Sequence, residues 1–318
     1  MPIELTDDQV CRLMGVSDFV DSCDQAFKLY GAGELRNLTR EEALERDGNV
    51  DVFRLELAGD WGGVLQGRKV IVERSDVSTG RLGDRSARIE LSLTQSGERV
   101  EIDAELITNR RTGAAAALGA RYLGPERPSI IGVIGSGRIA ESSTLALDHL
   151  LGPERILITS RRAETRERLA ERLQPDTKAD LLAVQSVEEA VSDSDVVVTT
   201  VPTPEPILTN DVLKEGAHLS VIAGDPRTVQ LDLEILLERP VVVDDLKQAY
   251  GSGDFLRYAE DRDRVPFVRC GGRIATIGDA ALGLLDEVRG QGVVTYFTGM
   301  AIQDLHAAYA ALMKRPTG

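Results

Sequence analysis

The feature that most constrains the fold is a series of short, uninterrupted apolar runs that begins after Pro128. The runs are "SIIGVIG", "RILITS", "ADLLAV", "DVVVTTV", "AHLSVIAG" and "VVVDD", and amphipathic helical segments separate them. Apolar residues that follow one another without alternation indicate strands buried on both faces, and helices between such strands are typical of βαβ crossovers. The six runs therefore predict a doubly wound parallel sheet.

A glycine motif follows the first of these strands. In "IIGVIGSGRIAESS" the spacing is Gly135-x-Gly137-x-x-Ala140, and the helical segment "RIAESSTLALDHLL" overlaps its end. In this context the first glycine permits a tight turn and the second lets the backbone approach a pyrophosphate at the helix N-terminus, while Ala140 allows close packing of helix on strand. The motif predicts a Rossmann-type dinucleotide-binding domain, with Arg138 and Ile139 also at the cofactor. The alternative is a tight turn that binds nothing.

The end of the second strand indicates which dinucleotide binds. NAD-binding domains usually carry Asp or Glu about 20 residues after the glycine motif, where the carboxylate accepts hydrogen bonds from the ribose hydroxyls. This chain has Ser160, Arg161 and Arg162 there. Serine and arginine can bind a 2′-phosphate by charge-assisted hydrogen bonds, whereas a carboxylate would repel it. The sequence thus favours NADP(H) over NAD(H); the alternative is a solvated arginine pair bound to Glu164 or Glu167.

Composition argues against several other classes of function. The net charge of −15 disfavours nucleic acid or an anionic membrane as the main partner. No apolar run approaches the roughly 18 residues that span a bilayer. The segment "MPIELTDDQV" lacks the basic and apolar parts of a signal peptide, so we expect a cytoplasmic protein. We expect no metal site, because no metal-type spacing links the candidate ligands Cys11, Cys23, Cys270, His149, His218 and His306.

The part of the chain before Pro128 has mixed α and β character. The segment "TDDQVCRLMGVSDFVDSCDQAFKLYGAGE" contains two helical stretches, and "ARIELSLTQSGERVEID" alternates apolar and polar residues around a Ser96-Gly97 turn, which predicts a hairpin. The small residues of "ELITNRRTGAAAALGARYLG" predict a helix that ends at Gly124. The tail "GMAIQDLHAAYAALMKR" predicts a last helix that packs back onto this N-terminal part. The region 262–294 has no clear pattern.

Several local patterns together resemble the ornithine cyclodeaminase/mu-crystallin family. The matching stretches are "GRKVIV", "ITNRRTGAAAALGARYLG", "GVIGSGRIA", "SVEEAVSDSDVVVTTVPTPEPIL", "KEGAHLSVIAGDP", "VVVDDLKQAYGSGD" and "GMAIQDLHAA". They occur in the family's order from about residue 67 onward. The resemblance implies a homodimer of two-domain chains, in which residues 1–124 with 295–318 form a substrate-binding and dimerisation domain of α+β type. Residues 125–294 would form the dinucleotide-binding domain.

The resemblance also implies a set of substrate-binding residues. It carries over Lys69, from "GRK", as a catalytic lysine that also binds the substrate carboxylate, and Arg111, from "NRRTGA", as a second carboxylate ligand. Asp225, from "AGDP", corresponds to the acidic group over the reacting carbon. The upstream arginine of the family's pocket falls in "LRNLTREE", where Arg36 is our candidate and Arg40 competes with it.

The family's nicotinamide contacts correspond to a second set of residues. These residues are Thr200, Val201 and Pro202, at the end of a strand. We also include Gly299, the first residue of "GMAIQDLHAA", among the expected cofactor-binding residues. The chain departs from the family at Ile139, where glutamine is common. It also departs after Asp225, where "PRTVQLD" replaces the Cys-Pro-Gly-Lys sequence associated with the cyclodeaminases.

The same residues have alternative interpretations without the family. Arg111 is expected near the N-terminus of a helix, where a bound carboxylate would use both the arginine and the helix end. It could equally pair with one of the chain's 52 acidic residues. Lys69 precedes the strand "VIV" and could face water. Asp225 follows a parallel strand at the edge where ligands bind, but it could simply close a turn.

Three functions are consistent with these features. The first is an NADP-preferring oxidoreductase that transfers hydride between the nicotinamide and the α-carbon of a small imino or amino acid. The second is an ornithine- or lysine-type cyclodeaminase, an ammonia-lyase with internally recycled NAD, against which Ser160, Arg161 and Arg162 argue. The third is a non-catalytic NADP-binding protein like the crystallin, against which the presence of Asp225 argues.

Overall fold

The computed structural model describes residues 2–78 and 82–316, which form two compact units. One unit comprises Met1–Arg111 and Met300–Gly318, and the other comprises Thr112–Gly299. We expected the boundaries near residues 124 and 294 instead. The observed boundaries differ because most of helix α3 (Glu105–Leu123) belongs to the second unit. In addition, Val294–Phe297 is a strand of that unit's sheet.

The second unit, which contains the glycine motif, is built on a seven-stranded parallel sheet of order β12-β15-β11-β10-β7-β8-β9. Each of the six expected runs forms a strand, and the seventh strand, β15, comes from a segment for which the sequence predicted none. The bounds are β7 Ile130–Ile134, β8 Arg155–Thr159, β9 Asp180–Ala183, β10 Val196–Thr199, β11 His218–Ile222, β12 Val241–Val243 and β15 Val294–Phe297. A separate two-stranded ribbon pairs β13 (Arg269–Cys270) with β14 (Arg273–Ile274).

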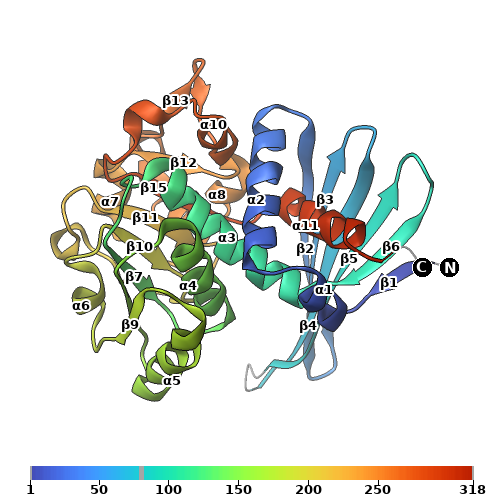
Figure 1. The fold of residues 1–318 in the computed structure, drawn as a ribbon, viewed down its shortest axis with the longest axis horizontal. Coiled ribbons are helices and arrows are strands. Elements are labelled where there is room, and N and C mark those ends of the chain that lie inside the picture. The colour runs from blue at the N-terminus through green and yellow to red at the C-terminus, as the bar shows by residue number, and fades with distance from the viewer. Residues whose placement is uncertain (1, 79–81, 317–318) are drawn as a thin grey trace. The chain divides into compact units, whose positions relative to one another are not determined.

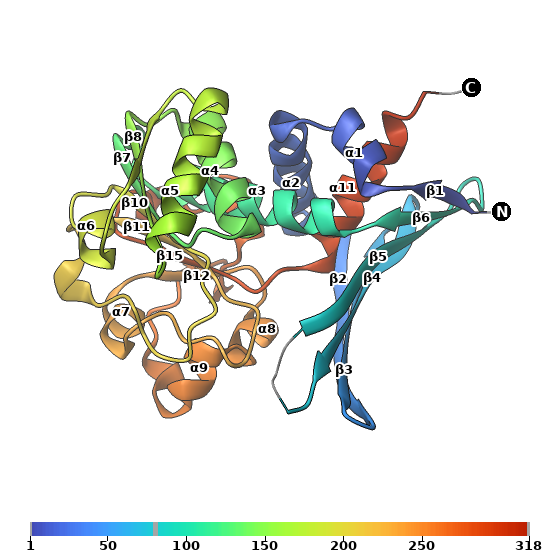
Figure 2. The same ribbon diagram turned by 90° about the horizontal axis from the view of Figure 1, so that it is seen from below.

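Helices cover both faces of this sheet, as a doubly wound fold requires. In Figure 2, α3, α4 and α5 lie on one side of the strands and α7, α8 and α9 on the other. The helices of this unit after α3 are α4 Arg138–Leu151, α5 Ala163–Leu173, α6 Val187–Val191, α7 Leu233–Glu238, α8 Leu246–Tyr250, α9 Gly253–Arg257 and α10 Ile277–Ala281. Glycine sets the distance between α3 and α4, because a Cβ on Gly113 would lie 2.3 Å from the backbone of Ser142.

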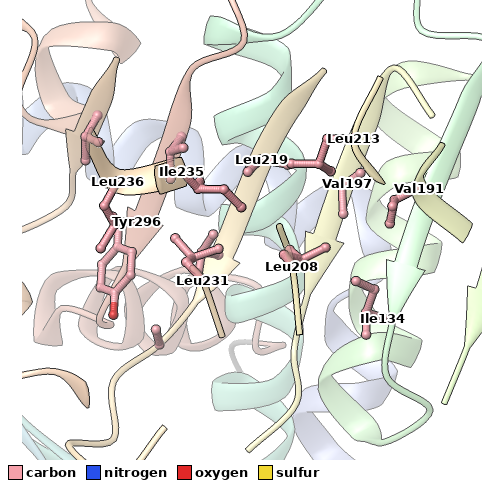
Figure 3. Close-up of a cluster of buried hydrophobic side chains, with 14 of the residues drawn as sticks. Ile134, Val191, Val197, Leu208, Leu213, Leu219, Leu231, Ile235, Leu236 and Tyr296 are labelled. Atoms are coloured by element: carbon pink, nitrogen blue, oxygen red, sulfur yellow. The ribbon is translucent and has the colours of Figure 1, made fainter. Parts of the chain in front are cut away.

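A continuous apolar core fills the space between the sheet and the helices on one of its faces. Its buried members come from most of the strands and from α6 to α9, and Figure 3 shows part of the cluster, including Ile134, Val197, Leu219, Ile235 and Tyr296. All of these side chains are almost completely buried. Apolar burial on the face opposite α3 therefore stabilises these strands.

The other unit is built on a six-stranded sheet of order β1-β6-β5-β4-β3-β2. β1 pairs parallel with β6, and the remaining pairs are antiparallel. The predicted hairpin is confirmed as the pair β5–β6. The bounds are β1 Ile3–Leu5, β2 Leu35–Asp47, β3 Val50–Trp61, β4 Leu65–Asp76, β5 Leu82–Leu93 and β6 Arg99–Asp103.

The helices of this unit pack on its sheet. They are α1 Asp7–Leu13, α2 Val16–Gly31 and α11 Ala301–Met313, and Thr6 and Gln9 close a capping box at the start of α1. Figure 1 shows α11, the last helix, lying with α2 over the strands, and α11 packs against α2 and strands β2 to β5. The expected return of the tail to the N-terminal part is thus observed. Within the described residues, no helix is long and apolar enough to cross a membrane.

Candidate functional site

A pocket opens at the carboxyl end of the parallel sheet, where β7, β8 and β10 end. Chain order reverses between the neighbouring strands β7 and β10, and open α/β sheets bind ligands at such a switch point. The cavity has a volume of about 520 Å³, within the range of small-molecule sites. The predicted cofactor residues among its lining are Gly135, Gly137, Ser160, Arg161, Arg162, Thr200, Val201 and Pro202.

The glycine turn has the geometry that its sequence predicted. Gly135 has φ of 133°, and a Cβ there would lie 2.3 Å from Oγ1 of Thr200, so the position accepts only glycine. Gly137 is the N-cap of α4, with ordinary backbone angles and no atom within 4 Å of the place of a Cβ. Ala140 is fully buried beneath the turn. The N-terminus of α4 is therefore open to a ligand at Gly137.

Besides the buried Ala140, three predicted cofactor residues lie outside the lining of this pocket. Arg138 is exposed and Ile139 is half-buried in the first turn of α4. The Gly299 N–H donates a 2.8 Å hydrogen bond to the buried carboxylate of Asp244. Burial raises the pKa of Asp244 to about 6, against the opposing effect of the hydrogen bonds that it accepts. Gly299 thus has a structural partner where β15 leads into α11.

The loop after β8 presents hydroxyls and the guanidinium groups of Arg161 and Arg162. Thr165 Oγ1 accepts a 2.9 Å hydrogen bond from Ser136 and lies 3.1 Å from Ser160 Oγ, so three hydroxyls form a chain across the pocket. Arg161 and Arg162 are exposed, and within the described residues neither forms an ion pair, so the expected alternative pairing with Glu164 or Glu167 is absent. Ser136 and Thr165 were missed by the sequence analysis, because nothing in the sequence shows that they meet.

A second cluster lies in the unit with the six-stranded sheet, where three buried charged side chains meet. Lys69 is on β4, Arg111 on α3 and Asp304 on α11. The Asp304 carboxylate accepts a hydrogen bond of 2.7 Å from Lys69 Nζ and one of 3.0 Å from Arg111 Nε, each on a different oxygen. The exposed fractions are 1% for Lys69, 6% for Arg111 and 0% for Asp304. Lys69 therefore faces the interior, and the water-facing alternative is excluded.

The charges of this cluster are unequal. Burial lowers the pKa of Lys69 to about 8, and the neighbouring Arg111 and Arg85 act in the same direction, whereas Asp304 opposes the change. With Lys69 protonated, Lys69 and Arg111 carry two positive charges against the single negative charge of Asp304. A buried charge without a partner is costly. The cluster therefore favours an additional anion.

The expected helix-end position of Arg111 is wrong. Helix α3 begins at Glu105, so Arg111 lies at the end of its second turn, beyond the part of the helix where the N-terminal dipole acts. What holds Arg111 instead is α11: Nε binds Asp304 and Nη1 binds Gln303 Oε1 at 3.1 Å. An anion at Arg111 would therefore contact the guanidinium itself and not the helix end.

Asp225 lies in the loop that follows β11, at the same edge of the parallel sheet as the pocket. Its carboxylate accepts hydrogen bonds from the backbone N–H of Arg227 at 2.8 Å and from the guanidinium of Arg227 at 2.9 and 2.6 Å. The side chain is 38% exposed. Asp225 therefore closes a turn, as one interpretation held, and it also keeps a carboxylate accessible to solvent.

A family model matches residues 3–312 of this chain, and its description is "Ornithine cyclodeaminase/mu-crystallin family". The chain belongs to this family. The match includes the glycine turn, the buried charged cluster and Asp225, so the resemblance seen in the sequence is confirmed.

Several members of the family are similar to this chain along most or part of its length. Alanine dehydrogenase of Archaeoglobus fulgidus is 29% identical over 311 residues, which cover 96% of this chain and 92% of that protein. The ketimine reductase mu-crystallin of Rattus norvegicus is 28% identical over 209 residues, or 65% of this chain and 62% of that protein.

Solved structures of similar proteins have the same fold as this chain. An archaeal alanine dehydrogenase dimer with bound NAD has a TM-score of 0.82 and 26% identity, with 98% of this chain and 95% of that chain covered. The Thermococcus litoralis Δ1-pyrroline-2-carboxylate reductase in complex with NADH and L-proline has a TM-score of 0.84 at 20% identity, with 98% and 97% covered, and shares the fold.

The family's upstream arginine has two candidates, and both are in ion pairs. Arg36 on β2 pairs with the buried Asp60 of β3, and Arg40 pairs with Glu42 on the exposed part of β2. Asp304 was not predicted, although it lies in "GMAIQDLHAA", one of the stretches that carried the resemblance. In the sequence it is one polar residue of an amphipathic helix, and only the packing of α11 brings it to Lys69.

Proposed function

We propose that this protein is an NADP-preferring oxidoreductase that transfers hydride between the nicotinamide and the α-carbon of a small imino or amino acid. The observation that carries the proposal is the buried cluster of Lys69, Arg111 and Asp304, in which two cations share one carboxylate. Membership in the family supports a broader assignment, which is an NAD(P)-dependent imino- or amino-acid reductase or a cyclodeaminase.

The unbalanced positive charge of the cluster fits a substrate carboxylate. Lys69 Nζ and the guanidinium of Arg111 keep N–H groups beyond those that Asp304 and Gln303 accept. A carboxylate would accept hydrogen bonds from both cations, and such charge-assisted contacts are the strong ones. Every α-imino and α-amino acid has a carboxylate next to the reacting carbon, so this contact would position that carbon.

The pocket of the dinucleotide-binding unit fits the proposed cofactor. Bound NADPH would supply the hydride and bound NADP+ would accept it in the reverse direction, and the protein's part is to orient the cofactor. Gly137 leaves the N-terminus of α4 open for a pyrophosphate, and Ser160, Arg161 and Arg162 suit a 2′-phosphate. We assign Asp225 the proton or water chemistry at the reacting carbon, because its carboxylate is accessible.

A substrate panel tests the reaction. We expect stoichiometric loss of NADPH when small keto acids are supplied with ammonia or an amine, with an amino acid of the matching mass as product. A cyclodeaminase would instead release ammonia from ornithine or lysine with no net change in nicotinamide absorbance, and that result would overturn the proposal. If Asp225→Ala preserved every measured function and NADPH binding, the protein would be a binding protein instead.

Removal of one guanidinium tests the cofactor preference. Arg161→Ala is expected to weaken NADPH binding about tenfold or more and to leave NADH binding unchanged, since only NADPH has a 2′-phosphate and a charge-assisted hydrogen bond contributes about 1.5–3 kcal/mol. Fluorescence titration with both dinucleotides measures this. Arg168→Ala is the matched control, because Arg168 is exposed on α5 outside the pocket lining. Tighter binding of NADH by the unaltered protein would show the preference to be wrong.

The pH dependence of substrate use should report the charge of Lys69. Protonated Lys69 binds a carboxylate and the neutral amine does not, and its pKa in the free protein is lowered to about 8. We therefore expect kcat/KM to hold below pH 8 and to fall as the pH rises above it, by at most about tenfold per pH unit. The dissociation constant of NADPH, measured over the same range, should lack this step. A kcat/KM that stays constant well above pH 8 contradicts the assignment.

Assembly and location are further proposals. The alanine dehydrogenase structure similar to this chain is a dimer, which supports a homodimer here. Light scattering of the purified protein tests the dimer, and a monomer mass at assay concentration would contradict it. The cytoplasmic location stays a prediction, to be tested by fractionation of the cells that produce the protein.

A further inference from the structure

We propose that Asp304 is the positioning residue of the carboxylate site, which holds Lys69 and Arg111 in the arrangement that receives the substrate. This inference rests on the proposed function and extends it to helix α11. None of the residues to which the proposed function gives a role lies on this helix. Asp304 does not itself bind a substrate carboxylate, because two carboxylates repel each other. It acts through the two cations.

The geometry divides the donors of the two cations into used and available groups. Asp304 Oδ2 accepts a hydrogen bond from Lys69 Nζ, and Asp304 Oδ1 accepts one from Arg111 Nε. Gln303 Oε1 accepts one from Arg111 Nη1. Within the described residues, Nη2 of Arg111 forms no hydrogen bond, and the remaining contact of Lys69 Nζ is a long one of 3.5 Å to Thr108. The two cations are thus fixed on one side and keep donors free for a ligand.

A pair of glycines brings α11 close enough for this contact. Gly59 of β3 and Gly67 of β4 are opposite each other in the sheet, and Lys69 follows on the same strand. A Cβ on Gly59 would lie 2.8 Å from Leu305, and one on Gly67 would lie 2.9 Å from the same side chain. Leu305 fills the space that the missing Cβ atoms leave. The residue before it, Asp304, consequently reaches the level of Lys69.

The first turn of α11 is itself fixed. Gln303 Oε1 accepts hydrogen bonds from the backbone N–H of Met300 at 3.0 Å and from Arg111, and its amide nitrogen lies 3.6 Å from the Cys23 sulfur. Gln303 is 1% exposed and Asp304 is fully buried. The carboxylate therefore has little freedom to leave the cations. A rigid support of this kind is what holds binding groups in a productive geometry.

The charge of Asp304 has a second effect. Without it, two cations would lie next to each other in the interior with no anion, and Lys69 would lose its proton more easily. Burial and Arg111 lower the pKa of Lys69, and Asp304 acts against both. Asp304 thereby keeps Lys69 charged near neutral pH. Arg85 is a further charged group that acts on Lys69, and it also lowers the pKa of this amine.

Asp304→Asn tests this role, because it removes the charge and keeps the shape. NMR titration of protein labelled at lysine Cε, with the Lys69 signal assigned by its loss in Lys69→Met, gives the pKa of Lys69 directly. We expect Lys69 to titrate at least about one pH unit lower in the variant. We also expect KM for the carboxylate substrate to rise about tenfold or more near pH 7.5, with NADPH affinity unchanged. The fall of kcat/KM with pH should begin at a lower pH.

Two further variants separate this role from a structural one. Asp304→Glu keeps the charge on a longer side chain, so Lys69 should stay charged while KM still rises. Asp18→Asn also removes a carboxylate from a contact between α2 and the end of α11, the exposed ion pair with Lys314. It should change neither the Lys69 titration nor KM, whatever it does to thermal stability.

Each outcome bears on one of the two proposals. A folded Asp304→Asn variant with an unchanged Lys69 titration and unchanged KM overturns the role of Asp304. If Asp304→Asn does not fold, an Asp304→Glu variant with unaltered KM overturns it equally. If the unaltered protein turns over no keto, imino or amino acid, the proposed function fails, and the NMR titration still decides whether Asp304 controls the charge of Lys69.

Discussion

Replacing Lys69 by methionine is expected to lower kcat/KM for a keto- or imino-acid substrate at least about a hundredfold, while thermal stability is retained. Loss of a buried, hydrogen-bonded charge from a binding site costs about 3 kcal/mol, which corresponds to about a hundredfold. The fold should tolerate the change because methionine fills a similar, unbranched volume. The remaining buried pair, Arg111 and Asp304, is electrically neutral.

Steady-state kinetics and thermal unfolding of the same preparations check this prediction. Lys28→Met is the matched control, since Lys28 lies in the same unit and forms a partly exposed ion pair with Asp24 one helical turn away. Its kinetic constants should not change. Full activity of Lys69→Met would remove Lys69 from the site. A large loss of thermal stability in Lys69→Met would mean that the Lys69–Asp304 pair serves the fold and not the substrate.

The parallel sheet was predictable because its strands are buried on both faces. Six runs of apolar residues stood out in the sequence, and each forms a strand. The strand that was missed, β15, contains Thr295 and Tyr296, whose polar atoms interrupt the apolar pattern. Both residues are fully buried, and Tyr296 donates its hydroxyl to Asp254 at 2.8 Å. The partner that makes this polar group acceptable is distant in the sequence, so the pattern alone could not reveal it.

The charged cluster shows a second limit of the sequence. Lys69 lies on a strand, and which face of a strand is buried depends on its register with its neighbours. Asp304 is separated from Lys69 by 235 positions and looks like one polar residue of an amphipathic helix. The resemblance to a family supplied Lys69, Arg111 and Asp225, but it did not supply the carboxylate that joins the first two. That carboxylate follows from the packing of α11 against the glycines of β3 and β4.

Replacing Gly137 by alanine is expected to weaken dinucleotide binding by roughly ten- to a hundredfold, equivalent to about 1.4–2.8 kcal/mol, with little change in protein stability. The added Cβ would meet no protein atom within 4 Å, and the backbone angles of Gly137 suit alanine. Its methyl group would instead occupy the space through which a pyrophosphate approaches the N-terminus of α4. Titration with NADPH and with NADH, beside thermal unfolding, measures both effects, and both dinucleotides should be affected equally.

Substitutions of two other glycines serve as controls for Gly137→Ala. Gly15 is the N-cap of α2 with nearly the same backbone angles as Gly137, so Gly15→Ala should reproduce any effect on helix capping without changing dinucleotide affinity. Gly135→Ala should destabilise the protein as well as weaken binding, because its φ is positive and its Cβ would collide with Thr200. A Gly137→Ala variant that loses stability but binds NADPH normally would place the pyrophosphate elsewhere than at the start of α4.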